Sequence, residues 1–178
     1  MDEEYYFKLI RNVPDFPKKG IQFKDITTLI KDPDGLKNSV DDIIKEFEGK
    51  KIDKVAGIES RGFIFGTPIA YQLGTGFIII RKPGKLPADT VREEYELEYG
   101  TDSIEMHVDA ISEGDRVLLV DDLLATGGTA EAAVKLVEKA GGKVVGVAFV
   151  IELTGSLDGR SKLADYEVVS LVKIKVEE

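Results

Sequence analysis

The residues best suited to chemistry are Asp121 and Asp122 and the turn that follows them, Thr126-Gly127-Gly128-Thr129. The apolar run Val117–Val120 just before them is typical of a buried parallel strand, which would end at the two carboxylates. Glycines in a strand-to-helix turn let backbone N–H groups approach an anion closely, and the N-terminus of the next helix adds positive potential. The pattern therefore predicts a phosphate-binding loop, with carboxylates suited to sugar hydroxyls or a hydrated cation.

Two other phosphate-binding signatures do not match this sequence. No lysine follows Gly128, as the Gly-x-x-x-x-Gly-Lys-Ser/Thr loop requires, and Gly74-x-Gly76 lacks the third glycine of the dinucleotide fingerprint. The alternative interpretation of residues 121–129 is a glycine-rich turn with two exposed acids and no ligand.

Two further clusters follow apolar runs. Glu59-Ser60-Arg61-Gly62 lies where a strand gives way to a helix, so its N–H groups and Arg61 suit a second anion. The alternative is a serine N-cap beside a solvated arginine. Arg81, Lys82 and Lys85 follow another apolar run, and solvated surface charge is the alternative there. The irregular, highly charged segment 81–102 is typical of a functional lid or of a disordered insertion, and Glu93–Tyr99 is expected to form a hairpin arm.

The elements that must position these residues alternate along the chain. The patterns predict helices at Asp2–Val13, Pro33–Phe47, Arg61–Leu73 and Gly128–Ala140. They predict strands at Ile52–Ile58, Gly76–Ile80, Val117–Val120, Val144–Ile151 and Val168–Val172. Strands that alternate with helices form βαβ units, so we expect a mainly parallel sheet with helices on its faces.

Composition excludes several classes of site and partner. The 178 residues include 24 Lys+Arg and 33 Asp+Glu, one His and no Cys, which excludes disulfides, thiolate metal sites, a thiol nucleophile and a multi-histidine metal site. The net charge of −9 argues against electrostatic binding of nucleic acid. The acidic N-terminus and the shortness of the longest apolar run, Val144–Ile151, predict a cytoplasmic protein without a membrane span.

Residues 117–129 resemble the ribose-phosphate motif of the type I phosphoribosyltransferases. Four other segments narrow the resemblance to the adenine phosphoribosyltransferases: Phe16–Ile26, Glu59–Gly66, Arg81–Pro87 and Tyr95–Gly100. The match runs in order from about Pro14 to Leu171, which is nearly the whole chain.

The resemblance implies a single domain over residues 1–178 with the type I phosphoribosyltransferase α/β fold. That fold is a mainly parallel, Rossmann-like sheet flanked by helices, with an N-terminal hood at about 1–32 and a flexible lid at about 83–100. The implied reaction transfers the 5-phosphoribosyl group from 5-phosphoribosyl 1-pyrophosphate (PRPP) to adenine, giving AMP and pyrophosphate. Mg²⁺, bound mainly through PRPP or pyrophosphate with no direct protein ligand, and a homodimer are also implied.

The resemblance also implies roles for individual residues. The residues implied to bind the ribose and 5-phosphate of PRPP are Asp121, Asp122, Ala125, Thr126, Gly127, Gly128 and Thr129. Those for pyrophosphate are Glu59, Ser60, Arg61, Arg81, Lys82 and Lys85. Those for adenine are Gln22, Phe23, Lys24 and Leu153. Glu98 would accept the proton that the purine loses; the alternative is that it is one of several lid acids without a specific role.

Three other functions fit parts of the sequence. Lys24 suits a ring carbonyl, which would favour a phosphoribosyltransferase for hypoxanthine or guanine. The same fold also serves non-catalytic purine-nucleotide sensors, although an acidic chain of 178 residues is expected to leave no room for an added DNA-binding domain. An RNA-binding regulator would need a broad basic face. We therefore expect small-molecule substrates, and neither nucleic acid nor membrane as a partner.

Overall fold

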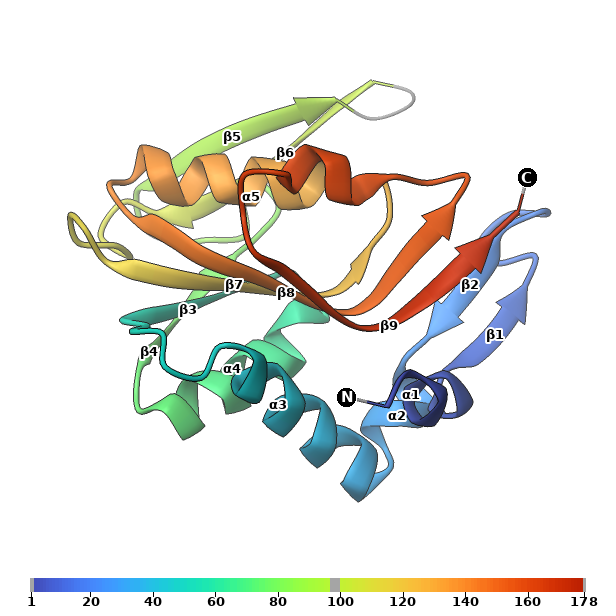
Figure 1. The fold of residues 1–178 in the computed structure, drawn as a ribbon. Helices are drawn as coiled ribbons and strands as arrows, with labels where there is room; N and C mark the ends of the chain where they lie inside the picture. Colours follow the sequence, from blue (N-terminus) through green and yellow to red (C-terminus); the bar gives the residue numbers. More distant parts are fainter. Residues whose placement is uncertain (1, 97–99, 178) are drawn as a thin grey trace.

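A computed structural model describes residues 2–96 and 100–177 and shows a central sheet of five parallel strands in the order β4-β3-β7-β8-β9 (Figure 1). The strands are β3 (Lys54–Ile58), β4 (Gly76–Ile80), β7 (Arg116–Leu124), β8 (Lys143–Gly155) and β9 (Val168–Val176). Valine, isoleucine and leucine make up most of the buried residues of these strands taken together, as expected for a sheet covered on both faces. The predicted parallel α/β fold is confirmed.

Helices cover the two faces of the sheet, as Figure 1 shows. One face carries α1 (Glu3–Leu9), α2 (Thr27–Ile30), α3 (Pro33–Glu46) and α4 (Gly62–Leu73). The other face carries α5 (Gly128–Lys139), the 3-10 helix η1 (Gly159–Leu163) and a hairpin of β5 (Thr90–Glu96) and β6 (Thr101–His107). Each layer buries its own apolar cluster against the sheet, which holds the strands in fixed register.

The N-terminal helix ends earlier than predicted. Instead of continuing to Val13, α1 stops at Leu9, and residues 11–14 form β1 (Arg11–Pro14), antiparallel to β2 (Gln22–Asp25). Pro14 disfavours helical backbone at the residue before it, and Val13 pairs with Phe23 across the hairpin. The helical prediction for residues 10–13 was therefore wrong.

The segment expected to be largely irregular contains more regular structure than predicted. β5 begins at Thr90 and pairs antiparallel with β6, so that Tyr95 lies opposite Asp102. In Figure 1 this hairpin lies along α5. Within the described residues, no helix is long and apolar enough to cross a membrane.

Candidate active site

Three neighbouring strands deliver the predicted site residues to one edge of the sheet. β4, β3 and β7 are adjacent and parallel, so their carboxyl ends lie together. The chain after β3 crosses by α4 to β4, whereas the chain after β7 crosses by α5 on the opposite face to β8. Ligands of open α/β sheets bind where the crossing direction reverses in this way.

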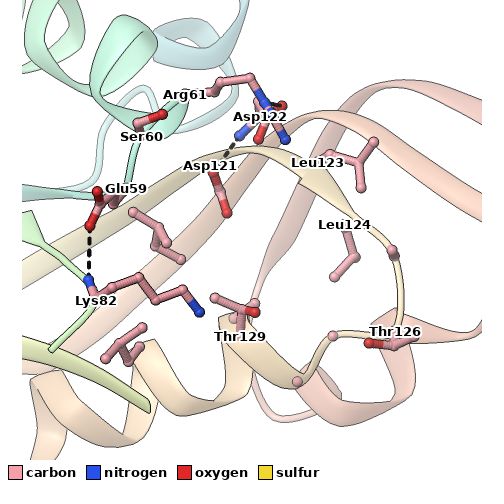
Figure 2. Close-up of a pocket in the computed structure, with 16 residues that line it drawn as sticks. Glu59, Ser60, Arg61, Lys82, Asp121, Asp122, Leu123, Leu124, Thr126 and Thr129 are labelled. Carbon is pink, nitrogen blue, oxygen red and sulfur yellow. Dashed lines mark hydrogen bonds and ion pairs between the residues drawn. The ribbon is translucent and has the colours of Figure 1, made fainter. Parts of the chain in front are cut away.

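A cavity of about 440 Å³ opens at this edge, and Figure 2 shows its lining. The predicted residues that line it are Glu59, Ser60, Arg61, Lys82, Asp121, Asp122, Ala125, Thr126, Gly127, Gly128 and Thr129. Arg81, Lys85, Gln22, Phe23, Lys24 and Leu153 do not line it. Glu98 lies outside the described residues. The structure thus brings together residues 121–129, residues 59–61 and Lys82, but not Arg81, Lys85 or the residues predicted to bind the base.

The loop after β7 leaves backbone N–H groups available to a ligand. Gly127 has a φ of +79°, a left-handed conformation that favours glycine, and α5 begins directly after it. No side chain caps the N-terminus of α5, so the orphan N–H groups of its first turn lack a side-chain acceptor. Together with the hydroxyl of Thr129, this geometry suits a phosphate.

The two carboxylates of β7 differ in their environment. Asp122 is 5% exposed and accepts a hydrogen bond from Nε of Arg61, whose side chain is 47% exposed. The Asp122 N–H donates to Oδ1 of Asp121 at 2.8 Å. Burial, and then the charge of Asp122, raise the pKa of Asp121 well above its ordinary value. Asp121 therefore holds its proton more tightly than an ordinary aspartate does.

The alternative prediction for this segment was a helix capped by the Ser60 side chain, with Arg61 in solvent. Arg61, rather than Ser60, occupies the N-cap position of α4, and no side chain caps that helix. The predicted serine cap is therefore wrong, and Arg61, although 47% exposed, pairs with Asp122 at the cavity.

Glu59 organises the cations that follow β4. Its carboxylate accepts hydrogen bonds from Nη2 of Arg81 at 3.1 Å and from the Lys82 N–H at 2.9 Å, and Lys85 Nζ lies 3.5 Å away. Burial alone would raise the pKa of Glu59, but these partners hold it below its ordinary value. Nε of Arg81 is buried without a hydrogen-bond partner among the described residues. Glu59 is thus ionised and fixes the positions of the basic residues around it.

Lys82 links the cavity to the β5–β6 hairpin. Its ammonium donates to Asp102 and, at 2.7 Å, to the Tyr95 hydroxyl, and it lies 5.3 Å from the centre of the Tyr95 ring. Burial would lower the pKa of Lys82, but Asp102 and Tyr95 raise it above its ordinary value. A protonated amine therefore faces the cleft, held by residues of the predicted lid.

The residues predicted to bind the base lie on the β1–β2 hairpin and at the end of β8. Phe23 is half-buried, and the Arg61 guanidinium lies 5.7 Å from the centre of its ring, which connects it to the cleft. Asn12 bridges the two residues that flank Phe23. Its side chain accepts a hydrogen bond from Lys24 Nζ at 2.7 Å and donates one to the Gln22 side chain at 2.7 Å. Leu153, near the end of β8, is partly buried.

Sequence reasoning missed several residues of the site. Ile58, Ile104, Leu123, Leu124 and Ala130 also line the cavity. Their apolar side chains carry no chemical signal in a sequence, so only their place on β3, β6, β7 and α5 reveals them. Asp102 and Asn12 were missed because their partners come from strand pairing that the sequence does not specify.

Comparisons with known proteins agree with this geometry. Residues 28–177 match the model of the phosphoribosyl transferase domain family. The adenine phosphoribosyltransferase of Clostridium perfringens is 65% identical over 94% of this chain and 96% of its own length. The chain belongs to the adenine phosphoribosyltransferase family. This membership confirms the resemblance that the five sequence segments indicate.

Solved adenine phosphoribosyltransferase structures share the whole fold. The Thermoanaerobacter pseudethanolicus enzyme superposes with a TM-score of 0.93 at 56% identity, covering 97% of this chain and 100% of its own. The Saccharomyces cerevisiae enzyme, crystallised with an imino-altritol bisphosphate and adenine, gives a TM-score of 0.88 at 39% identity over 95% of this chain and 97% of its own.

Proposed function

We propose that this cleft transfers the 5-phosphoribosyl group from PRPP to adenine, giving AMP and pyrophosphate. One observation carries the proposal. The ends of three adjacent strands place an uncapped helix N-terminus, a carboxylate pair and two cations around a single cavity. PRPP carries an anionic group at each end of a sugar, and this arrangement offers an anion site on each side of two carboxylates.

The 5-phosphate is assigned to the loop Ala125–Thr129. The first-turn N–H groups of α5 and the hydroxyls of Thr126 and Thr129 supply donors, and the helix dipole favours a dianion there. The ribose hydroxyls are assigned to Asp121 and Asp122. Their carboxyl oxygens can accept from the hydroxyls, and burial raises the pKa of Asp121 toward the form that can also donate.

Pyrophosphate is assigned to the cationic side of the cleft. Ser60, Arg61 and Lys82 line the cavity and can donate to its oxygens. Glu59, itself an anion, serves this site by holding Arg81 and the Lys82 backbone rather than by direct contact. Arg81 and Lys85 contribute positive potential from just outside the cavity.

Bond cleavage at the anomeric carbon leaves positive charge on the ribose, as in glycoside chemistry. Asp122 provides a fixed negative charge beside the ribose, and Arg61 and Lys82 face the charge that gathers on the departing pyrophosphate. Closure of the predicted lid, through Lys82 and its partners on the hairpin, would exclude water that competes with adenine for the ribosyl group.

Mg²⁺ fits this cleft as an ion carried by substrate. The described residues contain no cluster of three or more metal-ligating side chains, so pyrophosphate oxygens and water would supply most of its ligands. Asp121 and Asp122 are the carboxylates available to its water molecules. When bound, the ion would neutralise charge on the leaving pyrophosphate.

Adenine is assigned to the side of the cleft nearest the hood. Phe23 offers a ring face for stacking, Leu153 an apolar contact, and Gln22 and Lys24 their backbone groups. Burial lowers the pKa of Lys24, and its ammonium is already bound to Asn12. Glu98 is proposed as the acceptor of the purine proton.

The experiment that tests this function is a set of steady-state assays with PRPP and Mg²⁺ against adenine, hypoxanthine and guanine. We expect kcat/KM for adenine to exceed that for either oxopurine by at least about a hundredfold, because a site matched to one pattern of hydrogen bonds rejects another. Equal or faster turnover of hypoxanthine would overturn the adenine assignment. Tight purine-nucleotide binding without turnover would favour a sensor.

The proposal also includes a homodimer in the cytoplasm. The family resemblance implies that one basic residue of the segment after β4 serves the neighbouring subunit, and Arg81 and Lys85, which do not line this chain's cavity, are the candidates. Sedimentation at micromolar concentration distinguishes a dimer from a monomer of 19.6 kDa.

A further inference from the structure

The phosphate-binding loop rests directly on the backbone of a distant segment. A Cβ atom placed on Gly159 would lie 2.3 Å from the Ala125 carbonyl oxygen and 2.8 Å from the Gly127 nitrogen. Conversely, a Cβ atom on Gly127 would lie 2.4 Å from the Gly159 carbonyl oxygen. Contacts this short leave no room for any side chain between the two segments. The position of Gly159 therefore limits the position of the loop.

The residue after Gly159 is fixed by an ion pair that the proposed mechanism does not use, between the half-exposed Arg160 and the buried Glu152. The Arg160 guanidinium donates to both carboxylate oxygens of Glu152, at 2.8 and 2.5 Å, and to the Val168 carbonyl at 2.9 Å. The Ser170 hydroxyl donates to the same carboxylate at 2.8 Å. Arg160 thus ties the start of η1 to both β8 and β9. A bidentate arginine–carboxylate pair restricts orientation as well as distance.

Stability alone does not account for this pair. Desolvation of the buried Glu152 offsets part of the attraction, solvent screens the half-exposed Arg160, and the net contribution of such a pair to stability is small. What the pair supplies is a defined position for η1, because two strands and a planar guanidinium set it together.

We propose that Glu152, Arg160 and Gly159 are positioning residues for the 5-phosphate site. The ion pair fixes η1, Gly159 then supports residues 125–127, and the loop holds its N–H groups where phosphate binds. This inference rests on the proposed assignment of the loop to the 5-phosphate of PRPP. None of the three residues touches the reacting atoms.

The test compares Gly159→Ala and Arg160→Lys with the matched control Gly146→Ala. The control also forces a Cβ atom into occupied space, 2.2 Å from the Phe47 ring, but on the face of the sheet away from the phosphate loop. We measure KM for PRPP, kcat, the dissociation constants of AMP and of pyrophosphate, and thermal unfolding. AMP reports on the 5-phosphate site, and pyrophosphate reports on the opposite side of the cleft.

We expect Gly159→Ala and Arg160→Lys to raise KM for PRPP and weaken AMP binding by about tenfold or more, since a small displacement of positioned groups is costly. Pyrophosphate affinity should change less than about twofold, and Gly146→Ala should lower the melting temperature without these shifts. Wild-type AMP affinity in both variants would overturn the proposal. So would equal weakening of AMP and pyrophosphate, or the same pattern in the control. If Gly159→Ala does not fold, Arg160→Lys decides alone.

Thr129→Ala separates this inference from the assignment on which it rests. If Thr129→Ala binds AMP as tightly as the wild type, the loop is not the phosphate site and the assignment itself fails. If Thr129→Ala weakens AMP binding but Gly159→Ala and Arg160→Lys do not, only the positioning role fails.

Discussion

Replacing Asp122 with asparagine should separate activity from stability at this site. The side chain is 5% exposed, and asparagine keeps its volume while removing its charge. Arg61, which loses its ionic partner, has a side chain that is 47% exposed and can be solvated by water. We therefore expect the free energy of unfolding to fall by only about 1 kcal/mol.

The effect on catalysis should be larger than the effect on folding. In the proposed mechanism Asp122 accepts a charge-assisted hydrogen bond from the ribose and orients Arg61 toward pyrophosphate. Such a bond contributes about 1.5–3 kcal/mol. At 1.36 kcal/mol for each factor of ten, its loss lowers kcat/KM for PRPP by about 10- to 150-fold.

Steady-state assays with PRPP as the varied substrate, together with urea unfolding, measure both quantities. Asp53→Asn is the matched control, because Asp53 also pairs with an arginine: it accepts from Arg116 Nε at 2.7 Å and Nη2 at 2.8 Å. That pair lies at the amino-terminal edge of β3 and β7, away from the cleft. We expect the control to keep wild-type kcat/KM. If Asp122→Asn is folded and retains near-normal kcat/KM, or loses no more than the control, the assigned role is wrong.

Two further predictions concern Lys82 and Glu152. Lys82→Met removes a cation from the cleft and its bonds to the hairpin, so KM for PRPP should rise about tenfold in steady-state assays; an unchanged KM would contradict the pyrophosphate assignment. Glu152→Gln should lower the free energy of unfolding at pH 7 by about 1–2 kcal/mol, a modest cost because Arg160 is 38% exposed. Hydrogen bonds from Arg160 hold the pKa of Glu152 below its ordinary 4.5, so the wild-type advantage is present above pH 4.5 and is lost as pH falls through the lowered pKa. Urea unfolding at a series of pH values checks this, and a difference that widens in acid would refute it.

The sequence alone predicted the architecture and most of the residues that line the cavity. Strand β7 and its loop were recognisable because a continuous apolar run, two acids and a glycine-rich turn are local signals, set within a few residues of one another. The alternation of strands and helices likewise predicted a parallel sheet. Once the sheet is parallel, the ends of β3, β4 and β7 must meet at one edge.

Only the tertiary structure decided which groups face one another. The N-terminal helix was predicted to reach Val13, but residues 11–14 form β1 instead. Pairing of β1 with β2 is a non-local interaction that outweighs the local helical periodicity. The Lys82 contact with Asp102 depends on hairpin register, and the support of Gly127 by Gly159 depends on how η1 packs. These contacts join residues far apart in the chain, so no local pattern encodes them. The composition and motifs thus defined the chemistry, and the packing of distant segments determined the geometry in which it can take place.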